Sequence, residues 1–433
     1  MRNSTDRRLR SKVTVAALAG LLGLGLMTSL APTSAGAAAV HHTTEADTVA
    51  IPDQLSFGPT RVGDVSNTET ITLDNQGSNT DTIAALNLGG ADPDDFGGST
   101  DCLTEDGDPL TLAPGASCAI EMEFTPGSIG ARSATVEVVH DGPPIAIGLS
   151  GTGTVGYYLA TSSGGIYPFG DAQNYGDMSK ANLNAPIVSV QASADGYGYY
   201  LLGGDGGIFS FGDAQFFGST GALPLNAPVI SMAPTIDGGG YWLVAGDGGI
   251  FSFGDAQFFG STGSLPLNKP IVGMAETPDE GGYWLVASDG GIFAFGDAGF
   301  YGSTGALHLN KPIVGMEPTP DGGGYWLVAS DGGIFAFGDA GFYGSTGSLD
   351  LVRPIVGMAA SPDGLGYWLA ASDGGIFNGG DAPFLGGLGG TGIENVIGIA
   401  GTAPPTLQAA LDAPAARGRA GLARHPGWAR LRA

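Results

Sequence analysis

Basic residues, histidine and cysteine are scarce in this chain. It has 16 Lys and Arg against 42 Asp and Glu, which gives a net charge of -26 over 433 residues. Most basic residues gather near the two ends, and only six lie between Ala46 and Asp412: Arg61, Arg132, Lys180, Lys269, Lys311 and Arg353. Such an acidic protein repels phosphate backbones and anionic membrane surfaces. We therefore expect no nucleic acid partner.

The shortage of histidine and arginine also argues against several kinds of catalytic site. His308 is the sole histidine between residues 155 and 405, and Arg353 is the sole arginine there. A Ser/His/Asp triad needs a histidine beside its nucleophile, and a sialidase-like carboxylate clamp needs several arginines. A zinc site needs clustered His or Cys. We therefore expect a protein that is not an enzyme, with no cofactor and no metal.

The N-terminal segment is typical of a secretory signal peptide. An apolar run from Val13 to Ala31 follows four basic residues, Arg7, Arg8, Arg10 and Lys12. Ala35, Gly36 and Ala37 then supply an AxA cleavage site, so residues 1–37 are predicted to be the signal peptide. A retained membrane anchor is the alternative, because the run is nearly long enough to span a bilayer. Cleavage would leave an extracellular or cell-surface protein without a membrane segment.

The chain has two cysteines, Cys102 and Cys118. An exported protein keeps such a pair oxidised, so we predict a disulfide between them. Closing a loop of this size would add roughly 3 kcal/mol to the stability of a small domain by the chain-entropy model. A metal site is the competing interpretation, but further ligands are missing from the surrounding sequence.

Residues 47–153 contain runs of β-branched residues with a period of two, which predict the strands of a β-sandwich. The segments LSFGPTRVGDVSNTETITLDNQGS and DCLTEDGDPLTLAPGASCAIEMEFTPGSIGARSATVEV resemble the ASH-type immunoglobulin-like module, called choice-of-anchor D in secreted bacterial proteins. This resemblance covers about 105 residues. It implies an immunoglobulin-like sandwich that serves as a spacer or adhesive module, without catalysis.

A GY(Y/W)L run recurs every 42 residues, at Tyr157, Tyr199, Tyr241, Tyr283, Tyr325 and Tyr367. Each copy after the first contains a PIVGM run, a PDGGG turn, a YWLVAS run, a DGG turn and an IFAFGDA run, or close variants of them. A propeller blade of four strands has about 40 to 45 residues, whereas leucine-rich repeats are shorter and helical repeats lack this glycine and aromatic content. We therefore predict an all-β chain, with an immunoglobulin-like sandwich followed by a six-bladed β-propeller over residues 155–402.

These repeats resemble the GYWLVASDGGIFAFGDAGFYGSTG arrays of secreted proteins from high-GC Gram-positive bacteria, where such arrays sometimes stand beside cell-wall hydrolase domains. A looser similarity to RCC1-type repeats implies the propeller architecture alone, because the usual RCC1 His and Cys positions are absent.

The two ends of the array complement each other. The first copy lacks its own PIVGM run, whereas residues 395–400, NVIGIA, supply that run after the last copy. Propellers must satisfy the open edges of their first and last blades. We therefore predict that residues 395–400 pair beside residues 157–162 and complete six blades.

Each repeat contains one FGDA run, or GGDA in the last copy, and the aspartates of these six runs are the ligand-binding candidates: Asp171, Asp213, Asp255, Asp297, Asp339 and Asp381. Equivalent positions on six blades form a ring that could bind a cation or a polyhydroxylated ligand. The structural alternative is favoured, in which each carboxylate accepts hydrogen bonds from backbone N–H groups of its own turn. The missing DxDxDG pattern argues against calcium.

Two further repeated sets have structural explanations. The DGG turns carry Asp205, Asp247, Asp289, Asp331 and Asp373, which we interpret as hairpin turn residues. The YWLVA runs carry Trp242, Trp284, Trp326 and Trp368. Side chains alternate along a strand, so these tryptophans point away from their Tyr and Leu neighbours and pack between blades. Stacking on sugar rings stays open as their alternative role.

Residues 403–433 are rich in Ala and Arg and lack the turns and aromatics of the repeats, so we expect a disordered tail. A basic tail of this kind could instead dock on an acidic body or an anionic wall polymer. For the whole chain we expect a secreted or cell-surface, non-enzymatic binding or scaffold protein that works as a monomer. Blade loops at one rim of the propeller would recognise a wall glycan or a surface protein. The alternative is a polysaccharide hydrolase with paired aspartates in the central channel.

Overall fold

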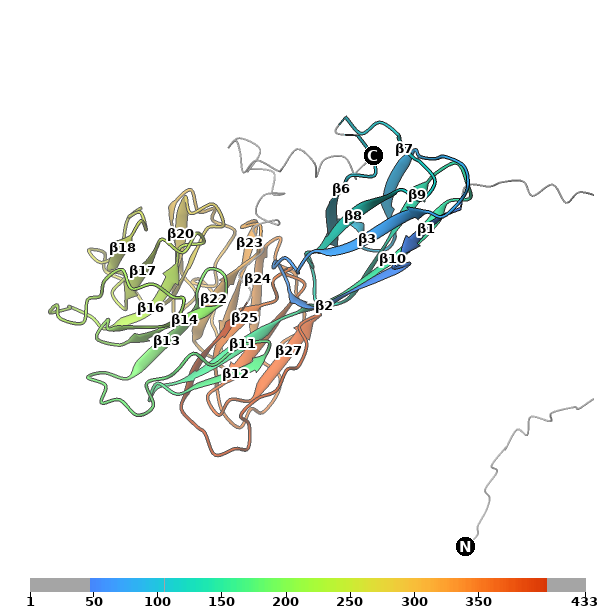
Figure 1. Cartoon of the computed structure of the whole chain (residues 1–433). Coiled ribbons are helices and arrows are strands. Elements are labelled where there is room, and N and C mark those ends of the chain that lie inside the picture. The colour runs from blue at the N-terminus through green and yellow to red at the C-terminus, as the bar shows by residue number, and fades with distance from the viewer. Residues whose placement is uncertain (1–46, 105, 403–433) are drawn as a thin grey trace, which may run out of the picture. The chain divides into compact units, whose positions relative to one another are not determined.

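The computed structural model describes residues 47–104 and 106–402, and these residues form an all-β protein (Figure 1). Within these ranges the one helical element is η1, a short 3-10 turn over Pro93–Asp95. None of the described residues forms a helix with the length and hydropathy needed to cross a lipid bilayer. The predicted signal peptide and Arg-rich tail lie outside the described residues.

The first ten strands form two four-stranded sheets and a small two-stranded sheet. One sheet has the order β1-β3-β8-β6, and its strands span Thr48–Ile51 (β1), Glu69–Asn75 (β3), Ser117–Phe124 (β8) and Phe96–Thr100 (β6). The other has the order β2-β10-β9-β5, with Gln54–Arg61 (β2), Ile145–Thr154 (β10), Gly130–Val139 (β9) and Ala85–Gly89 (β5). Strands β4 (Asp81–Ile83) and β7 (Leu110–Leu112) form the small sheet.

These two larger sheets enclose one hydrophobic core. Alternation along β8 buries Cys118, Ile120, Met122 and Phe124, and these side chains pack in one cluster with residues of β2, β3, β9 and β10. Phe124 packs against both Phe57 and Phe96, with ring centroids 5.9 and 4.9 Å away, and these two rings also contact each other. Burial at every second residue is typical of a strand that turns one face to a core.

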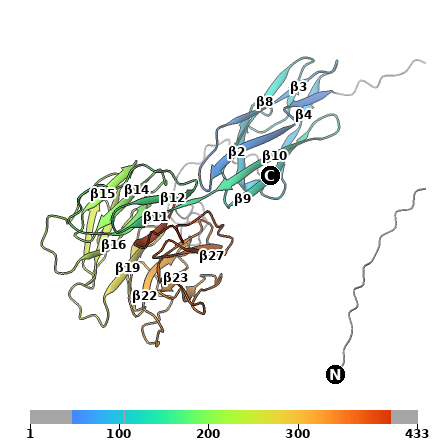
Figure 2. The same cartoon turned by 90° about the horizontal axis from the view of Figure 1, so that it is seen from below.

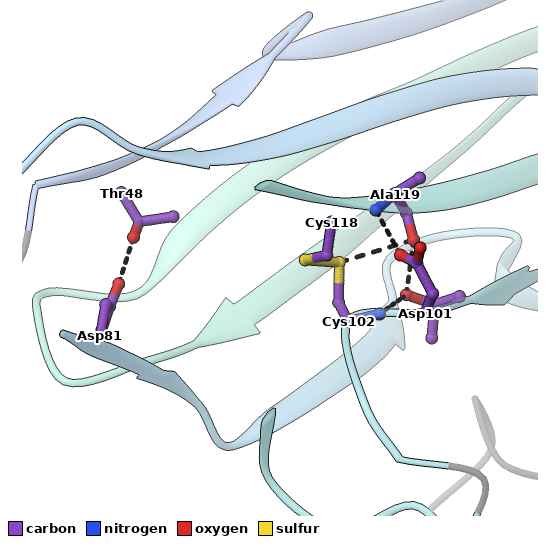
Figure 3. Close-up of a disulfide and its surroundings, with 7 residues drawn as sticks. Thr48, Asp81, Asp101, Cys102, Cys118 and Ala119 are labelled. Atoms are coloured by element: carbon purple, nitrogen blue, oxygen red, sulfur yellow. Dashed lines mark hydrogen bonds between the residues drawn. A yellow bond between two sulfur atoms is a disulfide. The ribbon is translucent and has the colours of Figure 1, made fainter. Parts of the chain in front are cut away.

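The Cys102–Cys118 disulfide is present in the structure, with both sulfurs inside the core (Figure 3). Asp101, next to Cys102, accepts a hydrogen bond from the backbone N–H of Ala119 at 2.5 Å. Thr100 accepts a hydrogen bond from the backbone N–H of Cys102 at 2.9 Å. The disulfide therefore joins the segment after β6 to the strand that β6 pairs with.

The remaining strands form six three-stranded antiparallel sheets. Five of these follow the chain, and their strands span Ile187–Ala192, Gly198–Gly203 and Ile208–Gly212 (β13–β15); Val229–Pro234, Gly240–Ala245 and Ile250–Gly254 (β16–β18); Ile271–Glu276, Gly282–Ala287 and Ile292–Gly296 (β19–β21); Ile313–Pro318, Gly324–Ala329 and Ile334–Gly338 (β22–β24); and Ile355–Ala360, Gly366–Ala371 and Ile376–Gly380 (β25–β27). The sixth sheet has the order β12-β11-β28 and joins Gly156–Thr161 (β11) and Ile166–Gly170 (β12) to Val396–Gly401 (β28).

The sixth sheet confirms the prediction for the ends of the array. Strand β28 pairs antiparallel with β11, with Tyr157 opposite Gly401 and Leu159 opposite Ile399. Figures 1 and 2 both show the green strands β11 and β12 beside the orange to red end of the array. We call the strand with the PIVGM-type run the first strand of each sheet, which is β28 in the sixth sheet. The first strands contact one another in cyclic order, β13, β16, β19, β22, β25, β28 and again β13.

Neighbouring sheets interlock through the aromatic residues of their middle strands. The four tryptophans are at most 1% exposed, and each packs on the tyrosine of the next repeat, as Trp242 packs on Tyr283. Trp368 of the last repeat packs on Tyr157 of the first in the same way. The predicted packing role of the tryptophans is therefore confirmed, and their burial removes them as surfaces for sugar stacking.

The tyrosine hydroxyls add a repeated hydrogen bond between sheets. Each donates to a glycine carbonyl of the segment before its own repeat at 2.5 to 2.7 Å, in the pairs Tyr157–Gly386, Tyr199–Gly176, Tyr241–Gly218, Tyr283–Gly260, Tyr325–Gly302 and Tyr367–Gly344. The pair Tyr157–Gly386 spans the two ends of the array with the contact used inside it. These glycines have positive φ, and a Cβ on Gly218 would lie 2.5 Å from the Phe253 ring, so the close approach needs glycine.

Each sheet has three strands rather than the four that the repeat length suggests. The segment after the third strand, such as residues 213–228, forms no ladder with that strand. It runs along the next sheet instead, where Phe217 packs against Tyr241 with ring centroids 5.6 Å apart. The hydroxyl of Tyr241 also donates to the Gly218 carbonyl of this segment.

Candidate functional site

The candidate aspartates lie at the ends of the third strands, on the edge where the first strand of each sheet turns into the second. Asp213, Asp255, Asp297, Asp339 and Asp381 are exposed there, and Asp171 is half-buried. Each backbone N–H bonds to the residue before the middle strand at 3.1 to 3.3 Å, as Asp297 bonds to Gly281. The structure therefore gathers the six residues at equivalent turns of one edge.

In five repeats a second aspartate lies beside the candidate. It comes from the turn between the first two strands, and the pairs are Asp195 with Asp213, Asp237 with Asp255, Asp279 with Asp297, Asp321 with Asp339, and Asp363 with Asp381. The sequence analysis treated this turn as structure and did not single out its aspartate. The recurring S/T-x-D before each middle strand is the signal that could have identified it.

A hydroxyl group joins the two carboxyl groups in several repeats. Thr319 Oγ1 lies 2.9 Å from an oxygen of Asp321 and 3.0 Å from one of Asp339, so it can donate to either. Ser193 and Ser361 are placed in the same way in their repeats. In the sheet that joins the two ends, Thr402 Oγ1 donates to Asp171 at 2.8 Å. Hydroxyl groups are thus hydrogen-bond donors to the candidate carboxylates beside the backbone N–H groups of their own turns that we expected.

In the pair Asp321 and Asp339, the two pKa values shift in opposite directions. Burial and the neighbouring Asp321 raise the pKa of Asp339. Burial opposes the shift of Asp321, but the backbone N–H of Gly323 and the hydrogen bonds from Thr319 and Asp339 hold its pKa below the usual value. Burial and Asp363 raise the pKa of Asp381 to about 6. Two carboxyl groups that lie this close disfavour each other's ionisation, which contributes to the raised pKa of Asp339 and of Asp381.

The DGG aspartates act as the turn residues that we predicted. In all five turns, Oδ1 of the aspartate accepts the backbone N–H two residues later at 3.0 Å, as Asp289 accepts from Gly291. Gly290, between these two residues, has a φ of 77°. These side chains therefore serve their own hairpins on the edge opposite the candidate aspartates.

The first strands of the six sheets surround a central cavity of about 230 Å³. Its lining includes aliphatic and methionine side chains, and its only ionisable members are Glu276 and Glu317 on the neighbouring strands β19 and β22. Burial raises the pKa of Glu276 to about 7, and burial together with the charge of Glu276 raises that of Glu317 to about 8. None of the six candidate aspartates lines the cavity.

The most exposed aromatic side chains form a repeated set that the sequence analysis missed. They are Phe216, Phe258, Phe300, Phe342 and Phe384, which are 59, 57, 64, 64 and 62% exposed. Each lies three residues after a candidate aspartate and just before a less exposed residue that packs on the next sheet. Neighbouring residues of an extended segment point to opposite sides, so burial of the second residue exposes the first. The FF, FY or FL pair within a Gly-rich segment was the available signal.

A second exposed set lies at the other end of the same segments. Leu223, Leu265, Leu307 and Leu349 are 54 to 59% exposed. The backbone N–H of each bonds to a threonine carbonyl, and that threonine bonds to the DGG turn, as Leu307 bonds to Thr304 and Thr304 to Gly290. These leucines therefore lie on the edge of the DGG turns, away from the candidate aspartates.

Within the described residues, the one cluster with metal-ligating atoms from three side chains is Asp101, Cys102 and Cys118. Both cysteine sulfurs are already joined in the disulfide, so neither is a thiolate ligand.

No protein-family model and no curated protein matches the chain. Its similarities are to solved structures. A Bacteroides thetaiotaomicron protein of unknown function aligns with a TM-score of 0.45 and 12% identity, over 83% of this chain and 93% of that one. The ASH/PapD-like domain 7 of human CEP192 aligns with a TM-score of 0.19 and 14% identity, over 30% of this chain and 96% of the domain. The VesB protease of Vibrio cholerae aligns with a TM-score of 0.20 and 19% identity, over 23% of this chain and 30% of that one.

Proposed function

We propose that this chain is a secreted or cell-surface, non-enzymatic binding or scaffold protein. In this proposal residues 47–153 form an immunoglobulin-like sandwich of the choice-of-anchor D type, and residues 155–402 form a six-bladed β-propeller. The cyclic contacts of the first strands and the pairing of β28 with β11 support the propeller. The two sheets around one core support the sandwich.

The candidate aspartates support a structural rather than a catalytic role. Five have a second carboxyl group in hydrogen-bonding distance, whereas the two carboxyl groups of a retaining glycosidase lie about 5 to 5.5 Å apart and those of an inverting enzyme lie farther apart. The central cavity of about 230 Å³ is also smaller than the roughly 300 Å³ at which ligand pockets begin. Both observations favour binding on the outer surface over hydrolysis in the channel.

The observation that carries the proposal is the exposure of five equivalent phenylalanines in consecutive repeats. An exposed phenyl ring contributes little to folding and lowers solubility. Phe384 is retained although the last repeat has Gly379 in place of the half-buried Phe337 of the preceding one. A repeat that has lost a packing aromatic but keeps the exposed one indicates that the exposed ring has a use at the surface.

The disulfide supports export, because such bonds persist in oxidising compartments. The partner in this proposal is a wall glycan or a surface protein, and the blade loops at one rim make the contact. Loops on a rigid scaffold commonly carry recognition.

Cosedimentation of the full chain with isolated cell walls of a high-GC Gram-positive bacterium tests the proposal. We expect the protein to pellet with the walls and to release no reducing sugar from them. Protein that stays in the supernatant would contradict the binding role, and steady release of reducing ends would favour the hydrolase.

A further inference from the structure

We propose that the five exposed phenylalanines are separate stacking platforms for the sugar rings of one neutral polysaccharide, which the protein binds at several repeats at once. This inference rests on the proposed binding function and assigns that function to Phe216, Phe258, Phe300, Phe342 and Phe384. It selects a glycan over a surface protein as the partner.

The rings are free to receive a ligand. All five are more than half exposed, and no aromatic contact within the described residues involves any of them. The residue after each one anchors the segment instead, as Phe259 packs on Tyr283 with ring centroids 5.6 Å apart. Anchoring fixes the backbone beside the exposed ring, so little conformational freedom is lost when a ligand covers it.

A hydrogen-bond acceptor accompanies each ring. The exposed Asp255 precedes Phe258 by three residues, and the same spacing holds in the other four repeats. Three residues of extended chain span at most roughly 10 Å, so the backbone positions of each aspartate and phenylalanine lie within the length of one or two sugar units. Sugars present C–H faces together with hydroxyl donors, and this combination matches both groups.

The charge of the array favours a neutral ligand. Lys180, Lys269, Lys311 and Arg353 are its only basic residues within the described part of residues 155–402. The aspartates beside the phenylalanines would repel phosphate or uronate groups. A lipid surface is disfavoured for the same reason, and the rings are also separated by a whole repeat rather than gathered in one apolar patch.

Repetition adds avidity. Once one ring holds a sugar unit, the rest of the same polymer is at high effective concentration for the neighbouring repeats. The first repeat has Asn174 in place of the phenylalanine, so the platforms occupy five consecutive repeats and leave one without.

The test uses the full chain and three sets of variants. In one set, alanine replaces the five phenylalanines singly and together; in the second, tyrosine replaces all five; in the control, alanine replaces the equally exposed Leu223, Leu265, Leu307 and Leu349. Affinity is measured by cosedimentation with walls stripped of protein by protease and by electrophoresis through gels that contain neutral wall polysaccharide. Tryptophan fluorescence during heating checks that each variant is folded.

We expect each single Phe→Ala substitution to weaken polysaccharide binding several-fold. The variant with all five substitutions should bind roughly 10² to 10⁴ times more weakly, because avidity is then removed. The Phe→Tyr and Leu→Ala variants should bind like the wild type. Equal binding by the wild type and a folded fivefold Phe→Ala variant would overturn the inference, as would an equal loss in the leucine variant. Wild-type binding to intact walls that disappears after protease treatment would favour a protein partner and overturn the glycan assignment alone. No binding to intact walls would reject the proposed function itself.

Discussion

Replacing Glu317 by Gln should stabilise the array at alkaline pH and leave its stability unchanged in acid. Glu317 is half-buried at the central cavity, where burial and the nearby Glu276 raise its pKa from 4.5 to about 8. Between those values the unfolded chain loses the proton while the folded chain keeps it. Stability therefore falls as the pH rises through this window and becomes level above the folded pKa.

The size of the effect follows from the pKa difference. A shift from 4.5 to about 8 corresponds to roughly 5 kcal/mol at about 1.4 kcal/mol per pKa unit. The side chain is only half-buried and faces the cavity, so water screens part of this cost and we expect about 1 to 3 kcal/mol. Gln191 holds the equivalent position of β13, which indicates that an amide fits this site.

Tryptophan fluorescence is a suitable assay, because Trp242, Trp284, Trp326 and Trp368 are all buried between the sheets of the array. The Tm of Glu317→Gln should match that of the wild type near about pH 4.5 and exceed it near about pH 9. Glu394→Gln is the control, since Glu394 is exposed and lies outside the cavity lining. A Tm difference that does not change with pH would refute the explanation.

Three further perturbations test other contacts. Tyr157→Phe and Tyr283→Phe should each lower the free energy of unfolding in denaturant by about 1 to 2 kcal/mol, because each leaves a glycine carbonyl without its donor. A much smaller loss for Tyr157→Phe would mean that the ends of the array are joined differently. Replacing Cys102 and Cys118 together by Ser should lower the free energy of unfolding by about 3 kcal/mol, and reductant should then cause no further loss. Asp381→Asn should raise the Tm at neutral pH and lose this advantage in acid, because the folded pKa of about 6 lies above the ordinary value of 3.8 for an aspartate; an advantage confined to acid would contradict the assigned sign.

The features that could be predicted from the sequence are those set by local chemistry and by the period. Each DGG turn needs an aspartate that bonds forward and a glycine with positive φ, so the turn residues follow from the sequence directly. The first copy lacks a PIVGM run, and an extra run of this kind follows the last copy. This complementarity predicts the pairing of β28 with β11. The disulfide follows because the chain contains one pair of cysteines.

The features that could not be predicted depend on how repeats meet. The second aspartate of each pair comes from the turn between the first two strands of the same sheet, and only the folded edge brings the two carboxyl groups together. The first strands carry a register shift, as between Ile271 and Gly273, which breaks simple alternation. For this reason the sequence alone does not show that Glu276 and Glu317 face the cavity. The segment after the third strand of each sheet contacts the next sheet, and this contact also depends on the tyrosine of the next repeat.

Cross-linking of the two ends of the array tests the central claim most directly. Ala160 lies opposite Gly398 in the pairing of β11 with β28, and a Cβ on Gly398 meets no atom within 4 Å. Ala160→Cys with Gly398→Cys should form a disulfide in the folded protein under mild oxidation, because the Cβ atoms of directly paired residues lie about 4.5 to 5.5 Å apart, close to the roughly 3.5 to 4.5 Å of a disulfide. Gly315, the equivalent residue of β22, gives the control pair with Ala160 and should not cross-link. Failure of the first pair to form the bond, or equal cross-linking of the control, would contradict a ring closed by its own first and last strands.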